Sequence, residues 1–120
     1  MNAALKWAAS HGYIKTIQDL LPLAQELNAG INDDDRLEIE FNEIIKIAAE
    51  HNHTKIVEIL LPIATNVDWA LQRAAKNGNI QIIRMLIARA RELRPALYEA
   101  EQINNQEIIK MLKTKKFIII

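Results

Sequence analysis

The chain has 120 residues, half of them hydrophobic, with 15 basic residues, 15 acidic residues and no cysteine. This length and composition favour one domain with its own core, and the balanced charge argues against nucleic acid or an anionic membrane as a partner. The lack of cysteine excludes disulfides, thiolate catalysis and cysteine-bound zinc. With no signal peptide and no uninterrupted apolar run of ~18 residues, we expect an intracellular, cytoplasmic protein.

Four related segments follow one another along the chain, and each is predicted to form a pair of short helices. Their approximate limits are residues 3–28, 35–66, 68–93 and 95–116. Aligned on a shared alanine, the segments lie 40, 26 and 26 residues apart, at Ala8, Ala48, Ala74 and Ala100. Because a helix pair of this size cannot bury its apolar faces alone, successive pairs are expected to stack into an α-solenoid.

The first helix of each segment carries an apolar residue three positions before the alanine, as in "LKWAASHG" and "LQRAAKNG". This spacing places both on one stripe of a helix, and the small alanines permit a neighbouring helix to approach closely. Four positions after the alanine every segment has Gly or Asn, at Gly12, Asn52, Gly78 and Asn104. These residues enter the left-handed conformation at low cost, so each is predicted to end the first helix before an apolar second helix begins.

The first two segments are joined by a longer link, "LNAGINDDDRLEIEFNE". Asn28, Gly30 and Asn32 are expected to break the chain there. The Asp33–Asp35 run is expected to begin a helix over 35–50 that overhangs its neighbours by about two turns, ~10 Å. The alternation in "LEIEF" is a competing indication of a strand.

Other residues mark the ends of helices and of the stack. Pro22 and Pro62 share a register in the second helices and are expected to kink or end them. Glu101 and Lys113 replace apolar residues in the fourth segment, which suggests a terminal repeat that faces water. The tail "KMLKTKKFIII" is interpreted as a domain boundary or as a segment that docks on the chain itself, and contact with a membrane surface is the alternative.

The runs "AASHGYIKTIQDLL", "AAEHNHTKIVEILL" and "AAKNGNIQIIRMLI" resemble the core of the ankyrin repeat, with its Ala-Ala pair, Gly-His-like turn, Ile-Val pair and Leu-Leu pair. The resemblance covers nearly the whole chain in about four units and implies an all-α, ankyrin-like solenoid. The family's Thr-Pro-Leu-His opening is reduced to one apolar residue, and its Gly-Ala-Asp tail, which forms the β-hairpin finger, is missing. The resemblance therefore implies a binding scaffold in which the first helices carry most of the recognition.

In the ankyrin core, the residue before the alanine pair and the two after it face the concave groove. The resemblance therefore implies these partner-binding residues: Trp7, Ser10, His11, Ile47, Glu50, His51, Arg73, Lys76, Asn77 and Glu99. An aromatic, an aliphatic and an arginine in one row are typical of interface hot spots, although Trp7 and Ile47 could instead pack on neighbouring repeats. Trp69 is a second candidate anchor, with a core or rim position as the alternative.

The sequence contains none of the common nucleotide-binding, hydrolase or zinc-protease motifs. His51 and His53 are assigned to the turn, because no acidic residue completes a zinc site. The acidic cluster of Asp33–Asp35 and Glu38 has Arg36 where a calcium ligand would be needed, so a solvated helix cap is preferred. We expect no catalytic residue, no metal and no cofactor.

The sequence thus predicts a scaffold that binds a protein partner, as a recruiting or regulatory module of a longer protein. The alternative is a structural unit that forms a homo-oligomer through the 35–50 helix or the apolar tail. Heavy use of isoleucine, asparagine and lysine together with ankyrin-like repeats also resembles host-directed proteins of intracellular bacteria. That origin would imply delivery into a host cytosol.

Overall fold

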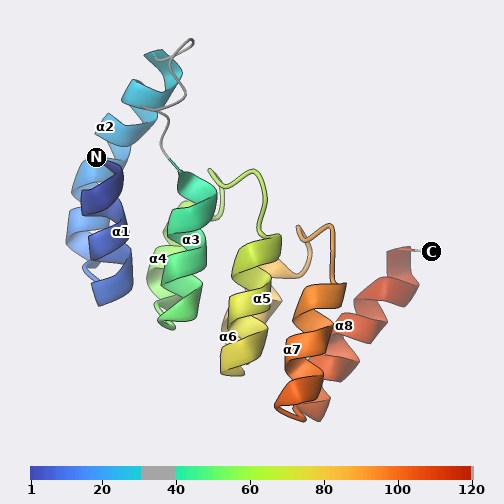
Figure 1. Cartoon of the computed structure of the whole chain (residues 1–120). Coiled ribbons are helices and arrows are strands. Elements are labelled where there is room, and N and C mark those ends of the chain that lie inside the picture. The colour runs from blue at the N-terminus through green and yellow to red at the C-terminus, as the bar shows by residue number, and fades with distance from the viewer. Residues whose placement is uncertain (31–39, 120) are drawn as a thin grey trace.

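The computed structural model describes the backbone of residues 1–30 and 40–119 and the side chains of residues 1–27 and 40–114. Within these residues the chain forms helices and turns but no strand, which confirms the predicted all-α class. The helices are α1 (Asn2–His11), α2 (Ile14–Gly30), α3 (Phe41–Glu50), α4 (Thr54–Leu60), α5 (Asp68–Asn77), α6 (Ile80–Leu86), α7 (Arg94–Gln102) and α8 (Gln106–Ile119) (Figure 1).

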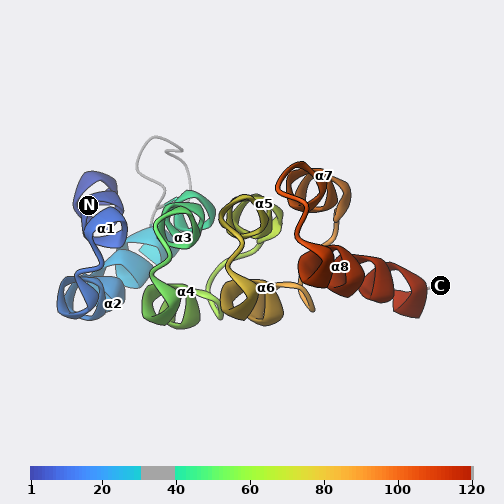
Figure 2. The ribbon, with the colours of Figure 1, turned by 90° about the horizontal axis from the view of Figure 1, so that it is seen from below.

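The helices form two layers. Figure 2 shows α1, α3, α5 and α7 side by side in one row, which we call the helix A layer, and α2, α4, α6 and α8 in a second row, the helix B layer. Each helix A packs against the helix A of the next pair and against its own helix B. Because the pairs stack in sequence order, equivalent positions of successive repeats form rows along the molecule.

The turn between the two helices of each pair is closed by a residue in the left-handed conformation. The φ angles are +77° and +71° at Gly12 and Gly78, and +62° and +54° at Asn52 and Asn104. In every repeat the next residue donates its backbone N–H to the carbonyl of the first alanine, over 2.9 to 3.0 Å. This hydrogen bond is typical of a Schellman motif, and it confirms the predicted helix ends.

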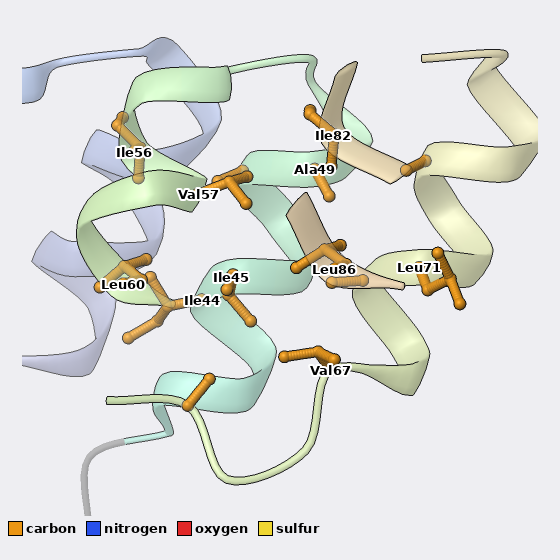
Figure 3. Packing of buried hydrophobic residues seen from close by; sticks show 14 of the residues in the cluster. Ile44, Ile45, Ala49, Ile56, Val57, Leu60, Val67, Leu71, Ile82 and Leu86 are labelled. Atoms are coloured by element: carbon orange, nitrogen blue, oxygen red, sulfur yellow. The ribbon is translucent and has the colours of Figure 1, made fainter. Parts of the chain in front are cut away.

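The core lies between and within the layers and is built from the repeated apolar positions. Both alanines of the first three repeats are fully buried, as are Leu5, Ile45 and Leu71. Figure 3 shows how side chains of α3 to α6 converge, among them Ile44, Val57, Leu60, Ile82 and Leu86. Burying one such large aliphatic side chain contributes about 1.5–3 kcal/mol, so the stacking of repeats stabilises the fold.

A continuous helix over residues 35–50 was predicted, and this prediction is wrong at residue 40, which is not helical. Glu40 is the non-helical N-cap of α3, with φ −88° and ψ +66°, and the helix begins at Phe41. The backbone N–H of Glu40 donates to Asn2 Oδ1 over 3.0 Å, which ties this residue to the preceding repeat. The predicted starting residues Asp33–Asp35 and the rest of the segment up to residue 39 lie outside the described residues.

The two prolines have different surroundings. Pro22 lies inside α2, which continues through Asn28 to Gly30, so Asn28 does not end the helix as expected. Pro62 follows the last residue of α4, Leu60, and so lies beyond the end of its helix. The two prolines occupy equivalent positions of their repeats, but α2 continues past Pro22, whereas α4 ends before Pro62.

The fourth repeat carries polar residues at two positions where the other repeats carry apolar ones. Glu101 is exposed, whereas Ala9, Ala49 and Ala75 at the same position are fully buried. Lys113 is also exposed, as predicted for a terminal repeat. The backbone of α8 is helical to Ile119, while the side chains of residues 115–120 lie outside the description.

Candidate protein-binding surface

The residues predicted to bind a partner lie on the helix A layer, near the C-terminal ends of its helices. We call the ten of them the helix A surface. His11, Glu50, His51, Lys76 and Asn77 are exposed, and Trp7 is 52% exposed. The remaining four are half-buried: Ser10, Ile47, Arg73 and Glu99. These residues come from equivalent positions of the four repeats, so the stacking of the repeats places them on the same side of the helix A layer.

Three side chains of the helix A surface form hydrogen bonds with backbone carbonyls near the C-terminal ends of helices. Ser10 Oγ donates to Trp7 O over 2.9 Å, and His11 Nδ1 lies 2.9 Å from the same carbonyl. Asn77 Nδ2 donates to the carbonyl of Glu50 in the preceding repeat. These three side chains therefore satisfy helix ends, which reduces their capacity to bind a partner.

An aromatic cluster occupies the first repeat. The ring centroids of Trp7 and Tyr13 are 4.8 Å apart, and His11 lies 5.2 Å from Trp7 and 5.5 Å from Tyr13. All three side chains are exposed. Large, rigid rings of this kind offer contact area at low entropic cost.

Trp69 is 52% exposed, so it is not a core residue. It lies on α5 four residues before Arg73, on the same side of the helix as the predicted surface. Lys46 of α3 places its Nζ 4.8 Å from the centroid of the Trp69 ring, a cation–π contact between repeats. The fold therefore makes Trp69 a neighbour of the helix A surface, which the spacing to Arg73 could have indicated.

A hollow of about 350 Å³ opens beside Trp69, with lining residues from α3, α5, α7 and the link before α5. The side chains that line it are Asn42, Asn66, Asp68, Trp69, Gln72 and Pro95. Gln72 has no hydrogen-bond partner among the described residues, and its amide can therefore serve a ligand. No motif or spacing in the sequence indicates this hollow, because its lining comes from α3, from the link before α5, and from α5 and α7.

In each of the first three repeats, a polar residue three positions before the apolar residue of helix A binds the segment that leads into the next helix A. Asn42 Oδ1 accepts the N–H groups of Thr65 and Asn66 at 2.9 and 3.1 Å, and Asn42 Nδ2 donates to Thr65 Oγ1 at 2.9 Å. At the equivalent position Asp68 Oδ1 accepts the N–H of Arg91 at 2.7 Å. These bonds fix the links that lead into α5 and α7.

Ionic contacts occupy the same edge in the first two repeats. Lys6 Nζ lies 2.5 Å from Glu40 Oε2 and 3.2 Å from Glu43 Oε2. The hydrogen bond with Lys6 lowers the pKa of Glu40 below its usual value, and the same bond raises the pKa of Lys6. Lys6 is thus occupied by the next repeat and is not available to a partner.

Within the described residues, no group of three or more histidine, aspartate or glutamate side chains is placed to hold a metal ion. His51 and His53 lie at the turn, as assigned, with ring centroids 6.3 Å apart. The His53 Nε2 atom is 3.0 Å from the carbonyl of Ser10 and so links two repeats. Among the residues that the structure describes, no helix is long and apolar enough to cross a membrane.

Stacked helix-turn-helix units with an exposed row along one layer define a solenoid repeat protein, a class that uses extended surfaces for binding. A family model described as ankyrin repeats (3 copies) matches residues 5–95 and 45–119, and the chain belongs to this family. No match was found among curated proteins or among solved structures. Ankyrin repeats are in general non-catalytic modules of protein–protein interaction.

Proposed function

We propose that this chain binds a protein partner through the outward side of its helix A layer. One observation carries the proposal: Trp7 of α1 and Arg73 and Lys76 of α5 all lie on this layer, yet none makes an ion pair or a side-chain hydrogen bond within the described residues. Tryptophan and arginine are the residue types that are enriched among the hot spots of protein interfaces. As part of a longer protein, this binding would recruit a partner or regulate an attached domain.

The experiment that tests the proposal is affinity purification with the chain as bait. The test variant combines Trp7→Ala with Lys76→Glu, and the control combines Lys55→Glu with Gln81→Ala, both exposed on the helix B layer. A protein that is retained by the wild type and the control but lost from the test variant, and that binds directly once purified, supports the proposal. A partner retained equally by both variants contradicts it.

Self-association is the second candidate function, and an apolar pair on α2 favours it. Leu23 and Leu27 are 53% and 45% exposed and lie four residues apart on one face of α2. Two copies could bury these residues against each other. Light scattering of the wild type and of Leu23→Lys across a concentration range tests this: a dimer that dissociates in the variant supports it, and a monomeric wild type rules it out.

A further inference from the structure

The helices α1 and α2 form one end of the described stack (Figure 1 and Figure 2), so one face of this helix pair lies against no other described repeat. In each later repeat the equivalent face packs on the repeat before it. In the fourth repeat, which no described repeat follows, the buried residues of this face include Ala96, Ile108 and Leu112. The corresponding residues of the first repeat are Ala4, Thr16 and Leu20, and none of them is buried. We call this face of α1 and α2 the open end.

Hydrogen bonds between inner repeats show that the position of Leu23 also belongs to the open end. Arg89, which aligns with Leu23, donates from its guanidinium to the carbonyls of Leu61 and Ala64 in the preceding repeat. Leu23 has no described repeat on this side and is exposed, and Leu27 follows it one turn later on the same face of α2. The exposed leucine pair of α2 is therefore part of the open end.

The open end is self-complementary along α2. Its four residues on this helix, which we call the α2 stripe, follow one another at spacings of four, three and four: Thr16, Leu20, Leu23 and Leu27. These spacings return to one side of a helix, and they read the same from either end. An antiparallel α2 of a second copy therefore places its Leu23 opposite Leu20 and its Leu27 opposite Thr16. A two-fold axis requires this kind of match.

Two charged residues beside the α2 stripe fit the same arrangement. Lys15 and Glu26 each come one position before a member of the stripe, so both lie on the same flank of α2, toward its opposite ends. When two α2 helices run antiparallel, Lys15 of each copy approaches Glu26 of the other. Within the described residues Lys15 forms a weak, exposed ion pair with Asp19 over 3.8 Å, and Glu26 forms none. The contact between two copies therefore gains two ion pairs.

The other end of the described stack is a poor complement to the open end. Ala9, Ala49 and Ala75 are buried by the repeat that follows each of them, whereas Glu101 at the same position is exposed. Lys113 likewise stands where the inner repeats have leucine or isoleucine. Head-to-tail stacking of two copies would remove both charges from water against the apolar residues of the open end, which costs free energy. The open end is therefore better matched to itself.

We propose that two copies of this chain associate through their open ends, with α2 packed antiparallel on α2 of the second copy. The two-fold axis passes between Leu20 and Leu23. Because α1 then packs on α1, the helix A layers of both copies face the same side. This inference rests on self-association, the second candidate function, and names its contact and symmetry. The dimer presents a helix A surface of twice the length, which a long or bivalent partner binds more tightly.

The open end is small, and its size sets the concentration at which the dimer forms. The 17 residues of α2 span ~25 Å, and the shortest dimension of the molecule is 19 Å. A face of this size is smaller than the ~800 Å² that each partner buries in a standard interface. We expect a reversible dimer with a dissociation constant of about 10–100 μM, in the range of weak, transient complexes.

The test measures mass by sedimentation velocity from ~5 μM to ~1 mM for the wild type, for variants of the open end and for matched controls. Leu27→Lys removes an apolar contact, and its control is Ile103→Lys, at an apolar side chain of nearly equal exposure in the fourth repeat. Lys15→Glu and Glu26→Lys each place like charges across the axis, and Lys55→Glu on α4 is the control for charge reversal. The variants Lys15→Glu and Glu26→Lys are measured alone and in an equal mixture. Thermal melting establishes that each variant is folded.

The dissociation constant of the wild-type dimer should rise about tenfold or more in Leu27→Lys and should not change in Ile103→Lys or Lys55→Glu. Lys15→Glu and Glu26→Lys alone should each raise it about three- to tenfold, and by less at high salt. Their mixture should restore a dimer of nearly wild-type affinity, because the heterodimer joins opposite charges at both ends of the contact.

Three other outcomes would overturn the inference in different ways. A wild type that stays monomeric at the highest concentration would overturn both the inference and the second candidate function, and would leave partner binding by the helix A layer standing. A dimer that the mixture does not restore, or that no open-end variant weakens, would overturn this contact and leave self-association through another arrangement. A mass that grows beyond that of a dimer would show head-to-tail stacking and overturn the two-fold symmetry.

Discussion

Gly12 and Gly78 have the same backbone conformation but different neighbours. A Cβ at Gly12 would lie 2.7 Å from Cε1 of His53, whereas a Cβ at Gly78 would meet no atom closer than 3.7 Å. Alanine at either site incurs a left-handed strain of about 1–2 kcal/mol. Gly12→Ala must also displace the His53 ring from Ser10, so we expect it to be the more destabilising by about 1 kcal/mol in urea unfolding. Equal losses would contradict this account.

The sequence predicted the conformation of these turn residues but not their neighbours. Only Gly and Asn occupy the position, and a residue type that tolerates positive φ can be recognised without coordinates. The contact between Gly12 and His53 joins residues 41 positions apart, and it depends on how two repeats stack. The residues proposed to bind a partner show the same limit, since spacing indicates that Arg73 faces outward but not that its guanidinium makes no ion pair with any described residue.

At the scale of elements, Asn42 tests how consecutive repeats are linked. Asn42→Ala removes three hydrogen bonds to Thr65 and Asn66, and because these groups are exposed we expect a loss of about 1–2 kcal/mol in urea unfolding. Asn42→Asp keeps both bonds from backbone N–H groups and adds negative charge in the first turn of α3, so it should be close to neutral. An aspartate variant as unstable as the alanine variant would show that the oxygen acceptor at residue 42 does not account for the stability that Asn42 contributes.

The two prolines provide a second comparison between elements. Pro22 has no N–H to donate to the carbonyl of Gln18 inside α2, so Pro22→Ala should restore a helical hydrogen bond and raise stability by about 1–2 kcal/mol. Pro62 lies after the end of α4, where its main effect is to restrict the unfolded chain. Pro62→Ala should therefore lower stability by up to about 1 kcal/mol. Thermal melting checks the opposite signs, and a lower melting temperature for Pro22→Ala would be evidence against the account.

Helix boundaries were predicted where a local signal determines them and missed where a distant contact does. The four helix A ends follow from Gly or Asn at one position. The start of α3 at Phe41 does not follow from the acidic run before it, because Glu40 is bound through its backbone to Asn2 and through its carboxylate to Lys6. Both partners belong to the preceding repeat, and they come close to Glu40 only when the two repeats stack.

At the scale of the whole molecule, repetition is what made the fold predictable. The alanine pair recurs because helices of the helix A layer approach closely, and the same pattern reveals which residues are inward in every repeat. The proposed binding surface lacks this redundancy, because Trp7, Ile47, Arg73 and Glu99 differ in chemistry at one position. We therefore expect the specificity of this proposed surface to depend on the residues that the repeats do not share.

Two polar residues of the fourth repeat interrupt the repeated apolar pattern. Glu101 and Lys113 stand where inner repeats have alanine and leucine or isoleucine, and both are exposed. The variant Glu101→Ala, Lys113→Leu would restore the inner pattern and expose apolar surface that can stack on a second copy. We expect its mass by light scattering to rise with concentration above that of the wild type.

The control for this prediction makes the same two types of substitution away from the end. Glu58→Ala, Lys55→Leu changes an exposed ion pair on the outer side of α4, where no further repeat could stack. Its mass should follow that of the wild type, because one apolar residue outside a stacking face gives no continuous contact. Association of both variants would mean that added hydrophobicity alone is responsible, whereas association of neither would mean that the polar residues of the fourth repeat do not limit the stack.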